Sequence, residues 1–371
     1  IEIAVTGGGE DSMQLNTATS GYLNGISALR HLYEGLYKLD ANGEIVLGQA
    51  ASAETSEDKL TWTFTLRDDI TWSDGQPVTA GDFVFGFDNL AAQGGDYSTI
   101  LSDVAESYEA PDDKTLVIKL KQPCGYLPSI LAFPPTYPAR QDYVEKYGEA
   151  YATDPDKAVY NGPYEMESWA HESEVVMKLR DDYYDAANIE VGTINWELIT
   201  EESSALASFE SGDYVYSDMC PDEEKPRMEG NGLVYTEGNN NYCVMFNLGD
   251  KGNEVLKDEK VREALSLTID RDRLISIRGL NDEMGVTLAC RGYVNADGTD
   301  FVDYCDPWED VSAYEEKILG SLSTPTFPSI ESETVFAKSE TVPWLIPSTF
   351  IPSSLPFVEL NSFTSSSNAA C

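Results

Sequence analysis

The clearest alternation of apolar and polar residues lies in the segment TWTFTLR, which starts at Thr61. Every second residue there is apolar and the residue types favour extended backbone, so the pattern predicts a strand with one buried face and one wet face. Turn-forming residues stand on either side, at Asp40-Ala41-Asn42-Gly43 and at Ser73-Asp74-Gly75. Such residues tolerate the backbone angles of tight turns, and both sites are therefore expected to be hairpin corners.

The pattern changes to a helical period directly after this region. Thr79 precedes Ala80-Gly81-Asp82, and a threonine at this place can accept a backbone N–H as an N-cap. An aspartate in the first turn favours the positive end of the helix dipole. We therefore predict a helix from about Ala80 to Leu90 with its apolar residues facing inward.

The same criteria predict further elements along the chain. Strands are expected at residues 1–5, 115–121, 164–169, 174–179 and 241–247, and helices at about residues 24–37, 140–147 and 201–211. From Asp258 onward the apolar residues recur at helical spacing, and Asp270 is placed to cap a short helix that starts at Arg271. The mixture of both periods indicates an α/β protein.

Length and charge narrow the class of protein. A chain of 371 residues is long enough for two or more lobes with cores of their own. Its net charge of −41 repels phosphate backbones and anionic lipid, so nucleic acid is not an expected partner. The acidic residues are spread along the chain, which favours a solvated surface over cation storage. No run of about 18 apolar residues exists, and the start at Ile1 fits a processed form or a fragment.

Cysteine and metal-ligand patterns give no site. The six cysteines form no CxxC pair and have no zinc-like spacing with the two histidines. A disulfide between Cys290 and Cys305 and free buried thiols remain equal alternatives. The segment Asn295–Asp300 lacks the ligand spacing of a calcium loop, so we interpret it as a turn. No metal and no cofactor are expected.

Catalytic motifs were the main alternative to a binding function. The chain has no GxSxG, HExxH or Ser-x-x-Lys set, and Gly7-Gly8-Gly9 is not followed by the residues of a phosphate-binding loop. His31 stands among leucines at helical spacing and is interpreted as a structural residue. Adjacent carboxylates such as Asp181-Asp182 arise by chance in so acidic a chain. We expect no enzyme.

The 21 tyrosines suit a binding cleft, although any single one is more often a core residue.

Several longer segments, taken in order, resemble one family. They are YEGL from Tyr33, TWTFTLRDDITWSDGQPVTAGDFVFGF from Thr61, YNGPYEMESW from Tyr160, RDDYYDA from Arg180, ALASFESGDYVY from Ala205 and DEKVREALSLTIDRDRLI from Asp258. This combination is similar to the extracellular solute-binding proteins of oligopeptide and dipeptide ABC importers, over roughly residues 15–319. One departure is Leu15-Asn16-Thr17, where that family often has Leu-Asp-Pro.

The resemblance implies a fold and a domain order. It implies an α/β fold like that of type II periplasmic binding proteins, with two lobes, an inserted subdomain in lobe one and an incomplete second lobe. Lobe one would comprise residues 1–40 and 160–245, the inserted subdomain 41–159, and the start of lobe two 246–320, with a hinge near 241–247. Residues 321–371 are rich in serine, threonine and proline. They are either a linker-like tail or the product of a frame error or gene-fragment end, and their scattered aromatic residues favour the second explanation.

The resemblance also implies a function without chemistry. The chain would capture peptides outside the membrane and deliver them to a permease, as a monomer in the extracellular or periplasmic space, lipid-anchored in its precursor. Ligand contacts would come from the positions that match the family's cleft: Ser20, Gly21, Tyr22, Tyr97, Asn241, Tyr242 and Cys243. The acidic residue that pairs with the peptide's amino terminus would lie in a part of lobe two that is missing here. A receptor for another small solute, such as a nickel complex or a sugar, and a surface adhesin or signal-peptide receptor remain alternatives.

Overall fold

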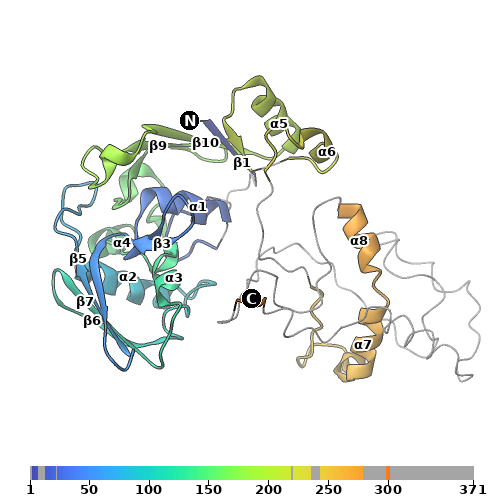
Figure 1. Ribbon diagram of the computed structural model, residues 1–371, viewed down its shortest axis with the longest axis horizontal. Coiled ribbons are helices and arrows are strands. Elements are labelled where there is room, and N and C mark those ends of the chain that lie inside the picture. Colours follow the sequence, from blue (N-terminus) through green and yellow to red (C-terminus); the bar gives the residue numbers. More distant parts are fainter. Residues whose placement is uncertain are drawn as a thin grey trace, which may run out of the picture. The chain divides into compact units, whose positions relative to one another are not determined.

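The computed structural model describes residues 2–6, 13–21, 23–218, 220–234, 243–278 and 298–300. The chain divides into two units, residues 1–221 and 222–371, which are described separately. Figure 1 shows their elements. Within the described residues, no helix combines the length and apolar character needed to cross a membrane.

A mixed five-stranded sheet forms one part of the first unit. Its strand order is β11-β1-β10-β9-β8, with β1 parallel to both β10 and β11 and the other pairs antiparallel. The strands are β1 (Glu2–Thr6), β8 (Tyr164–Ala170), β9 (Glu174–Leu179), β10 (Thr193–Ile199) and β11 (Tyr216–Ser217). The strands expected at 1–5, 164–169 and 174–179 are therefore confirmed. Parallel pairing joins β1 to two strands from the far end of the unit. Among the described residues the segment between β1 and β8, hereafter the inserted segment, adds no strand to this sheet.

A second, antiparallel sheet lies within that inserted segment. Its order is β4-β5-β7-β6, formed by β4 (Ala50–Thr55), β5 (Thr61–Leu66), β6 (Ala105–Asp112) and β7 (Thr115–Leu120). Phe64 and Leu66 of β5 are buried, as the alternating pattern predicts. The expected hairpin at 40–43 joins β2 (Tyr37–Leu39) to β3 (Ile45–Leu47), where the Asp40 carboxylate accepts the backbone N–H of Asn42 and of Glu44.

Helix α2 (Ala80–Gln93) confirms the predicted start signal. The Thr79 hydroxyl accepts the backbone N–H of Asp82, whose carboxylate accepts the backbone N–H of Thr79 in return. This reciprocal pair satisfies two backbone donors that a helix start otherwise leaves without partners. The same carboxylate also accepts the indole N–H of Trp72 at 3.2 Å, which ties the helix start to the hairpin corner at 73–75.

The remaining helices are shorter. In the first unit they are α1 (Leu23–Leu32), α3 (Leu127–Leu131), α4 (Gln141–Tyr147) and α5 (Glu202–Ser211), and in the second unit α6 (Lys225–Met228), α7 (Glu259–Leu267) and α8 (Arg271–Arg278). The helices expected at 140–147 and 201–211 are confirmed, and Gly212 ends α5 in a left-handed conformation. Asp258 caps α7, and the Asp270 carboxylate accepts the backbone N–H of Arg273 in the first turn of α8.

Two predicted elements differ from the structure. The first helix ends at Leu32 and not near Tyr37, because the following backbone bonds to Asn161 instead: Glu34 donates its N–H to the Asn161 side chain and accepts from its amide. The strand expected at 241–247 is absent from its described part, 243–247, where most side chains are exposed. An isolated apolar run needs a neighbouring strand to satisfy its backbone, and the described residues provide none there.

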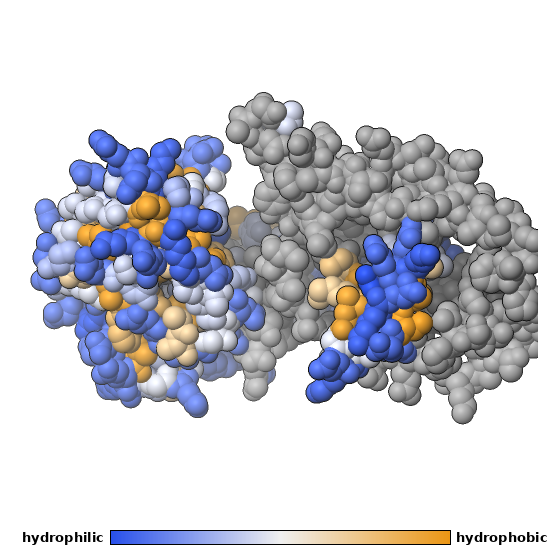
Figure 2. Space-filling model, turned by 90° about the horizontal axis from the view of Figure 1, so that it is seen from below, coloured by the Kyte–Doolittle hydropathy of each residue, from blue (hydrophilic) through white to orange (hydrophobic). Residues whose placement is uncertain are grey.

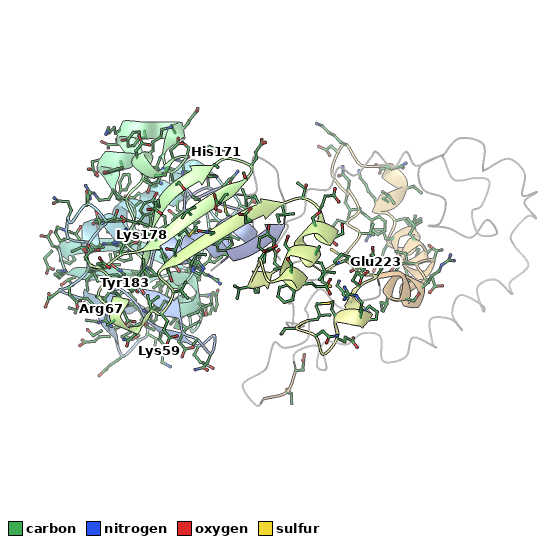
Figure 3. The ribbon with its side chains drawn as sticks, turned by 90° about the horizontal axis from the view of Figure 1, so that it is seen from above. Lys59, Arg67, His171, Lys178, Tyr183 and Glu223 are labelled. Carbon is green, nitrogen blue, oxygen red and sulfur yellow. The ribbon has the colours of Figure 1, made fainter. Side chains whose placement is uncertain are left out.

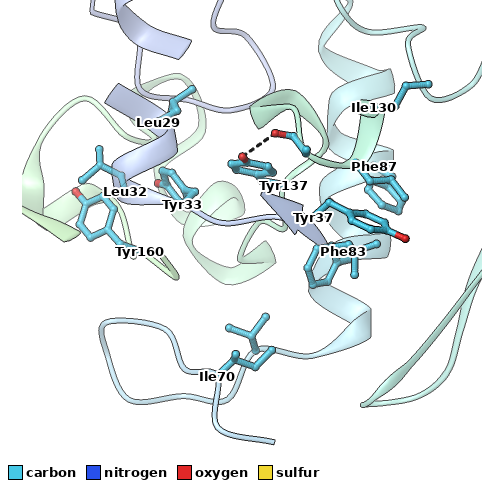
Figure 4. Close-up of a cluster of buried hydrophobic side chains, with 14 of the residues drawn as sticks. Leu29, Leu32, Tyr33, Tyr37, Ile70, Phe83, Phe87, Ile130, Tyr137 and Tyr160 are labelled. Carbon is cyan, nitrogen blue, oxygen red and sulfur yellow. Dashed lines mark hydrogen bonds between the residues drawn. The ribbon is translucent and has the colours of Figure 1, made fainter. Parts of the chain in front are cut away.

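One hydrophobic core connects both sheets of the first unit. It joins residues of the mixed sheet, such as Met177 and Trp196, to residues of the inserted sheet, such as Phe64 and Ile118. Figure 4 shows part of this core, in which α1, α2 and the loop before α4 contribute side chains and the Tyr137 hydroxyl donates to the Ala132 carbonyl at 2.9 Å. The core is thus shared, which holds the inserted segment firmly against the rest of the unit.

Candidate ligand-binding surface

Asn16 shapes the loop that precedes α1. The Asn16 amide oxygen accepts the backbone N–H of Ala18 at 3.0 Å, and the Asn16 carbonyl accepts the backbone N–H groups of Thr19 and Ser20. Such a turn is typical of asparagine, which explains how the chain tolerates its departure from Leu-Asp-Pro at this place. Ser20 is buried at the end of the turn.

A second loop of the inserted segment runs beside this one. A Cβ atom placed on Gly21 would lie 2.8 Å from the Asp96 carboxylate, and one placed on Gly95 would lie 3.3 Å from the Ala18 carbonyl. The segments 18–21 and 95–97 are therefore in contact although they are distant in sequence. This brings together three of the predicted contact positions, Ser20, Gly21 and Tyr97.

Tyr97 is partly buried at this meeting point. Its ring packs edge-on against Phe133, with 4.8 Å between centroids and an angle of 84°. Edge-to-face pairs of this kind fix a ring in place while leaving its remaining faces available. The candidate surface is defined here as Ser20, Gly21, Asp96, Tyr97 and Phe133.

An open apolar pocket adjoins the candidate surface and shares Phe133 with it. The pocket has a volume of about 270 Å³ and is lined by Arg30, Leu39, Ile45, Ile100, Ser129, Ile130, Ala132 and Phe133. Figure 2 shows one face of the molecule, on which the coloured hydrophobic residues lie in patches among hydrophilic ones. Pockets with apolar walls and few polar groups are typical ligand sites. Sequence reasoning missed these residues, because the pocket is assembled from four separate segments.

The structure does not test the other predicted contact positions. Tyr22, Asn241 and Tyr242 lie outside the described residues, and Cys243 is an exposed free cysteine of the second unit. Their assignment stays a prediction. The alternatives for Cys290 and Cys305 and most of the segment Asn295–Asp300 also lie outside the described residues.

A buried polar network, hereafter the polar network, lies in the same unit. It consists of the side chains of Glu34, Lys38, Gln49, Asn161, Tyr183 and Tyr184. The Glu34 carboxylate accepts from Gln49 at 3.1 Å and from Tyr183 at 2.7 Å, and pairs with Lys38 at 3.0 Å. A buried charge needs such partners, and here they come from three parts of the chain, around Lys38, at Gln49 and at Tyr183.

The electrostatics of the network follow from burial and from Glu34. Burial and then the Glu34 carboxylate raise the pKa of Tyr183 far above its usual range. Burial alone would lower the pKa of Lys38, but Glu34 and the hydrogen bond to Tyr184 raise it above its ordinary value. Arg67 stacks over Tyr184 at 4.5 Å from the ring centroid, and Figure 3 shows Arg67 and Tyr183 in the same region. The tyrosines therefore stay neutral and the lysine charged, which is a structural arrangement.

Arg180 connects the segment that begins at Thr61 to the segment that begins at Tyr160. Its guanidinium is buried and donates to the carbonyls of Tyr160 at 2.9 Å, Gly162 at 3.1 Å and Thr71 at 3.0 Å. The residue thereby holds the hairpin corner near Thr71 against the chain that enters β8. Gly162 also comes so close to the end of α1 that a Cβ atom would lie 2.6 Å from the backbone of Leu32 and Tyr33.

The chemistry-bearing residues form no reactive arrangement in the described part of the chain. His31 is partly buried between Tyr164 and Trp196, as expected for a structural residue, and burial together with Arg30 lowers its pKa to about 4. No three His, Cys, Asp or Glu side chains among the described residues are grouped as metal ligands would be.

A mixed sheet with an antiparallel sheet inserted into its unit is the fold of the class of extracellular solute-binding proteins. The chain belongs to the bacterial extracellular solute-binding proteins, family 5, whose model matches residues 44–283. It is 30% identical over 272 residues to the oligopeptide-binding protein OppA of Bacillus subtilis, covering 67% of this chain and 49% of that relative. It is 29% identical to the periplasmic OppA of Salmonella typhimurium, with the same coverage of both chains.

Solved structures give the same fold. The OppA of Burkholderia pseudomallei matches with a TM-score of 0.72 at 28% identity, covering 86% of this chain and 66% of that one. The substrate-binding domain of an oligopeptide ABC transporter from Bacillus anthracis matches with a TM-score of 0.69 at 26% identity, covering 86% and 67%. The chain spans about half the length of the Bacillus subtilis and Salmonella typhimurium proteins. The α/β fold of periplasmic binding proteins expected from the resemblance is confirmed.

Proposed function

We propose that this protein is the peptide-binding receptor of an ABC importer. The observation that supports this most directly is the contact between segments 18–21 and 95–97, which places Ser20, Gly21 and Tyr97 on one surface beside an apolar pocket. Backbone groups in such loops can pair with an extended peptide, and a roomy pocket accepts varied side chains. The names of the relatives, which are oligopeptide-binding and dipeptide-binding proteins, point to the same ligand class.

The proposal includes where and how the receptor works. It would act outside the cytoplasmic membrane as a lipid-anchored monomer, capture a peptide, and present it to a membrane permease. Closure of two lobes about a hinge would shift the population from an open to a closed form when the peptide binds. The finer domain boundaries, with a hinge near residues 241–247, belong to this proposal. So does the absence of catalysis.

The test is a calorimetric titration of the chain with a set of defined peptides of two to five residues. We expect measurable binding of several unrelated sequences and none of the corresponding free amino acid mixture, because main-chain contacts do not depend on sequence. Binding of a nickel complex, a sugar or one defined peptide alone would contradict the proposal. Tryptophan fluorescence on the same samples reports whether the chain is folded, so that a failure to bind is not confused with unfolding.

A further inference from the structure

Asparagine is followed directly by glycine at four places in the chain: Asn24, Asn42, Asn161 and Asn231. In such a pair the backbone nitrogen of the glycine can attack the side-chain amide of the asparagine, because glycine has no Cβ atom that hinders the approach. This reaction is one reason why asparagine is a thermolabile residue. The surroundings of each pair decide whether the attack can take place in the folded protein.

Asn42 and Gly43 lie at the tip of the β2–β3 hairpin. Both are exposed, and Gly43 has a φ of 79° with no atom within 4 Å of the place where a Cβ atom would stand. The Asn42 amide donates to the Asp40 carboxylate at 3.4 Å, which is long for a hydrogen bond. The hairpin pairs only three residues on each side, and short two-stranded hairpins are marginally stable. The Asn42 side chain can therefore turn toward the Gly43 nitrogen.

Asn161 and Gly162 are the same pair in opposite surroundings. The Asn161 side chain is buried, accepts the backbone N–H of Glu34 at 3.2 Å and donates to the Glu34 carbonyl at 2.8 Å. A Cβ atom on Gly162 would lie 2.6 Å from the backbone of Leu32, so the ring that the attack forms has no room there. This pair is expected to be inert while the chain is folded.

The attacking nitrogen is held alike in the two pairs. Gly43 donates its N–H to the Asp40 carbonyl and Gly162 donates its N–H to the Leu32 carbonyl, each at 3.0 Å. A difference in reactivity must therefore come from exposure and from the restraint on the amide. Local opening of an exposed hairpin tip costs much less free energy than opening of the buried core.

The two remaining pairs are weaker candidates. Asn231 is exposed, but its amide donates at 2.9 Å to the carbonyl of Arg227, four residues earlier, which holds the side chain toward the preceding turn. The Asn24 side chain lies outside the described residues. Asn42 thus combines exposure, a long hydrogen bond and an unobstructed glycine.

We propose that Asn42 is a site of spontaneous deamidation. The Gly43 nitrogen forms a bond to the side-chain carbonyl carbon of Asn42, and the bond from that carbon to the amide nitrogen breaks. The amide nitrogen leaves as ammonia and takes with it the proton of the Gly43 nitrogen. One water molecule then opens the resulting succinimide ring. Cleavage of the new bond yields aspartate, and cleavage of the original peptide bond yields isoaspartate, in which the main chain runs through the former side chain.

The products change the hairpin tip by charge and by length. The Asp40 carboxylate accepts the backbone N–H of Asn42 at 2.8 Å and of Glu44 at 2.9 Å, and a second carboxylate beside it adds repulsion between like charges. Isoaspartate also adds one atom to the main chain of the turn, which fixes the register of the strands. The strand pair nearest the tip, Leu39 and Ile45, lines the apolar pocket. Deamidation therefore loosens one wall of this pocket.

The test is to age the full chain at pH 8 and 37 °C, with and without urea, and to map its tryptic peptides by mass spectrometry. Peptide 39–59 contains Asn42 as its one asparagine, and peptide 158–178 contains Asn161 as its one asparagine. In the folded chain we expect Asn42 to convert at least about tenfold faster than Asn161, because the buried pair must first open. In urea the two should convert at similar rates. Asn42→Gln should stop the conversion in peptide 39–59, since glutamine would have to close a larger ring.

Each result decides one part of the proposal. If Asn42 converts no faster than Asn161 in the folded chain, or converts only in urea, the assignment of the site is overturned. Methylation of aged peptide 39–59 by an isoaspartyl methyltransferase, absent from Asn42→Gln, supports the succinimide route. Hydrogen exchange at residues 37–47 should be faster in the aged parent than in aged Asn42→Gln. Equal exchange in both would overturn the effect on the pocket wall.

Discussion

The polar network and the candidate surface are built in opposite ways. The network buries a charged group, Glu34, and satisfies it with partners that include Asn161 and Tyr183, more than a hundred residues away, whereas the surface leaves Tyr97 partly exposed with its ring against Phe133. Four of the six residues of the network, Glu34, Asn161, Tyr183 and Tyr184, lie in segments that carry the family resemblance, whereas Ser20, Gly21 and Tyr97 of the surface lie in loops outside them. The comparison teaches that much of the family's characteristic sequence maintains the scaffold of the first unit.

Removal of Arg180 is expected to have the largest effect on stability. Arg180→Met removes the side-chain donor from the carbonyls of Thr71, Tyr160 and Gly162, and a buried polar group left unsatisfied typically costs about 1–3 kcal/mol. Urea unfolding followed by circular dichroism measures the change. Lys178→Met, on the exposed side of β9, is the matched control and should stay within about 0.5 kcal/mol of the parent. A loss below 1 kcal/mol would show that the scaffold does not depend on this residue.

The packing of His31 predicts a loss of stability in acid. Burial, and secondarily Arg30, lower its pKa from 6.5 to about 4 in the folded chain. The unfolded chain therefore binds a proton between these pH values while the folded chain does not, so stability is complete above pH 6.5 and falls as the pH approaches 4. The part due to His31 is at most about 3 kcal/mol.

Unfolding free energies at pH 7.0, 5.5 and 4.5 measure this slope. His31→Phe should remove this slope in part, so the unfolding free energy of the variant should rise relative to that of the parent toward low pH. His171→Phe changes an exposed histidine that stacks on Trp169 and is the control that should keep the slope. An equal slope in the parent and in His31→Phe would contradict the prediction.

Alanine substitutions at Gly162 and at Gly21 test whether the scaffold and the candidate surface differ in how tightly they are packed. At Gly162 a Cβ atom would meet backbone atoms of Leu32 and Tyr33 at 2.6 Å, and backbone cannot move aside without cost, so we expect Gly162→Ala to lose about 1–3 kcal/mol. At Gly21 it would meet the end of the Asp96 side chain at 2.8 Å, which can rotate away. Gly21→Ala should therefore change thermal stability by less than about 0.5 kcal/mol. Equal losses at both positions would remove the distinction between the two regions.

Local patterns were sufficient to predict most elements of the first unit. Each of these features depends on residues that are close in sequence, so it can be predicted from the local pattern alone. Examples are the capping pair Thr79 and Asp82, the alternation in β5 and the end of α5 at Gly212. The end of α1 at Leu32 could not be predicted in this way, because it is decided by Asn161, more than a hundred residues away. Propensity gives way when tertiary hydrogen bonds fix the backbone.

The candidate surface was only partly predictable for a related reason. The resemblance indicated Ser20, Gly21 and Tyr97, and the structure brings these three together. The pocket beside them depends on Arg30, Ile100 and Phe133, which are single residues in separate segments. No spacing links such residues, so their proximity appears only when the chain is folded. A lone arginine among the apolar residues of α1 was the one available indication.

Replacement of Tyr97 is expected to have little effect on stability and to act mainly on binding. Tyr97→Ala removes a partly buried ring whose described aromatic contact is Phe133, so the loss of stability should stay below about 1 kcal/mol. Peptide affinity should fall about tenfold, since a rigid aromatic face beside the pocket contributes contact area. Tyr143→Ala, a partly buried tyrosine of α4, is the matched control and should leave the affinity unchanged. The relative size of the stability loss and the affinity loss decides the role of Tyr97. A large stability loss with unchanged affinity would place Tyr97 in the scaffold. The contact between segments 18–21 and 95–97 would then serve folding and not ligand capture.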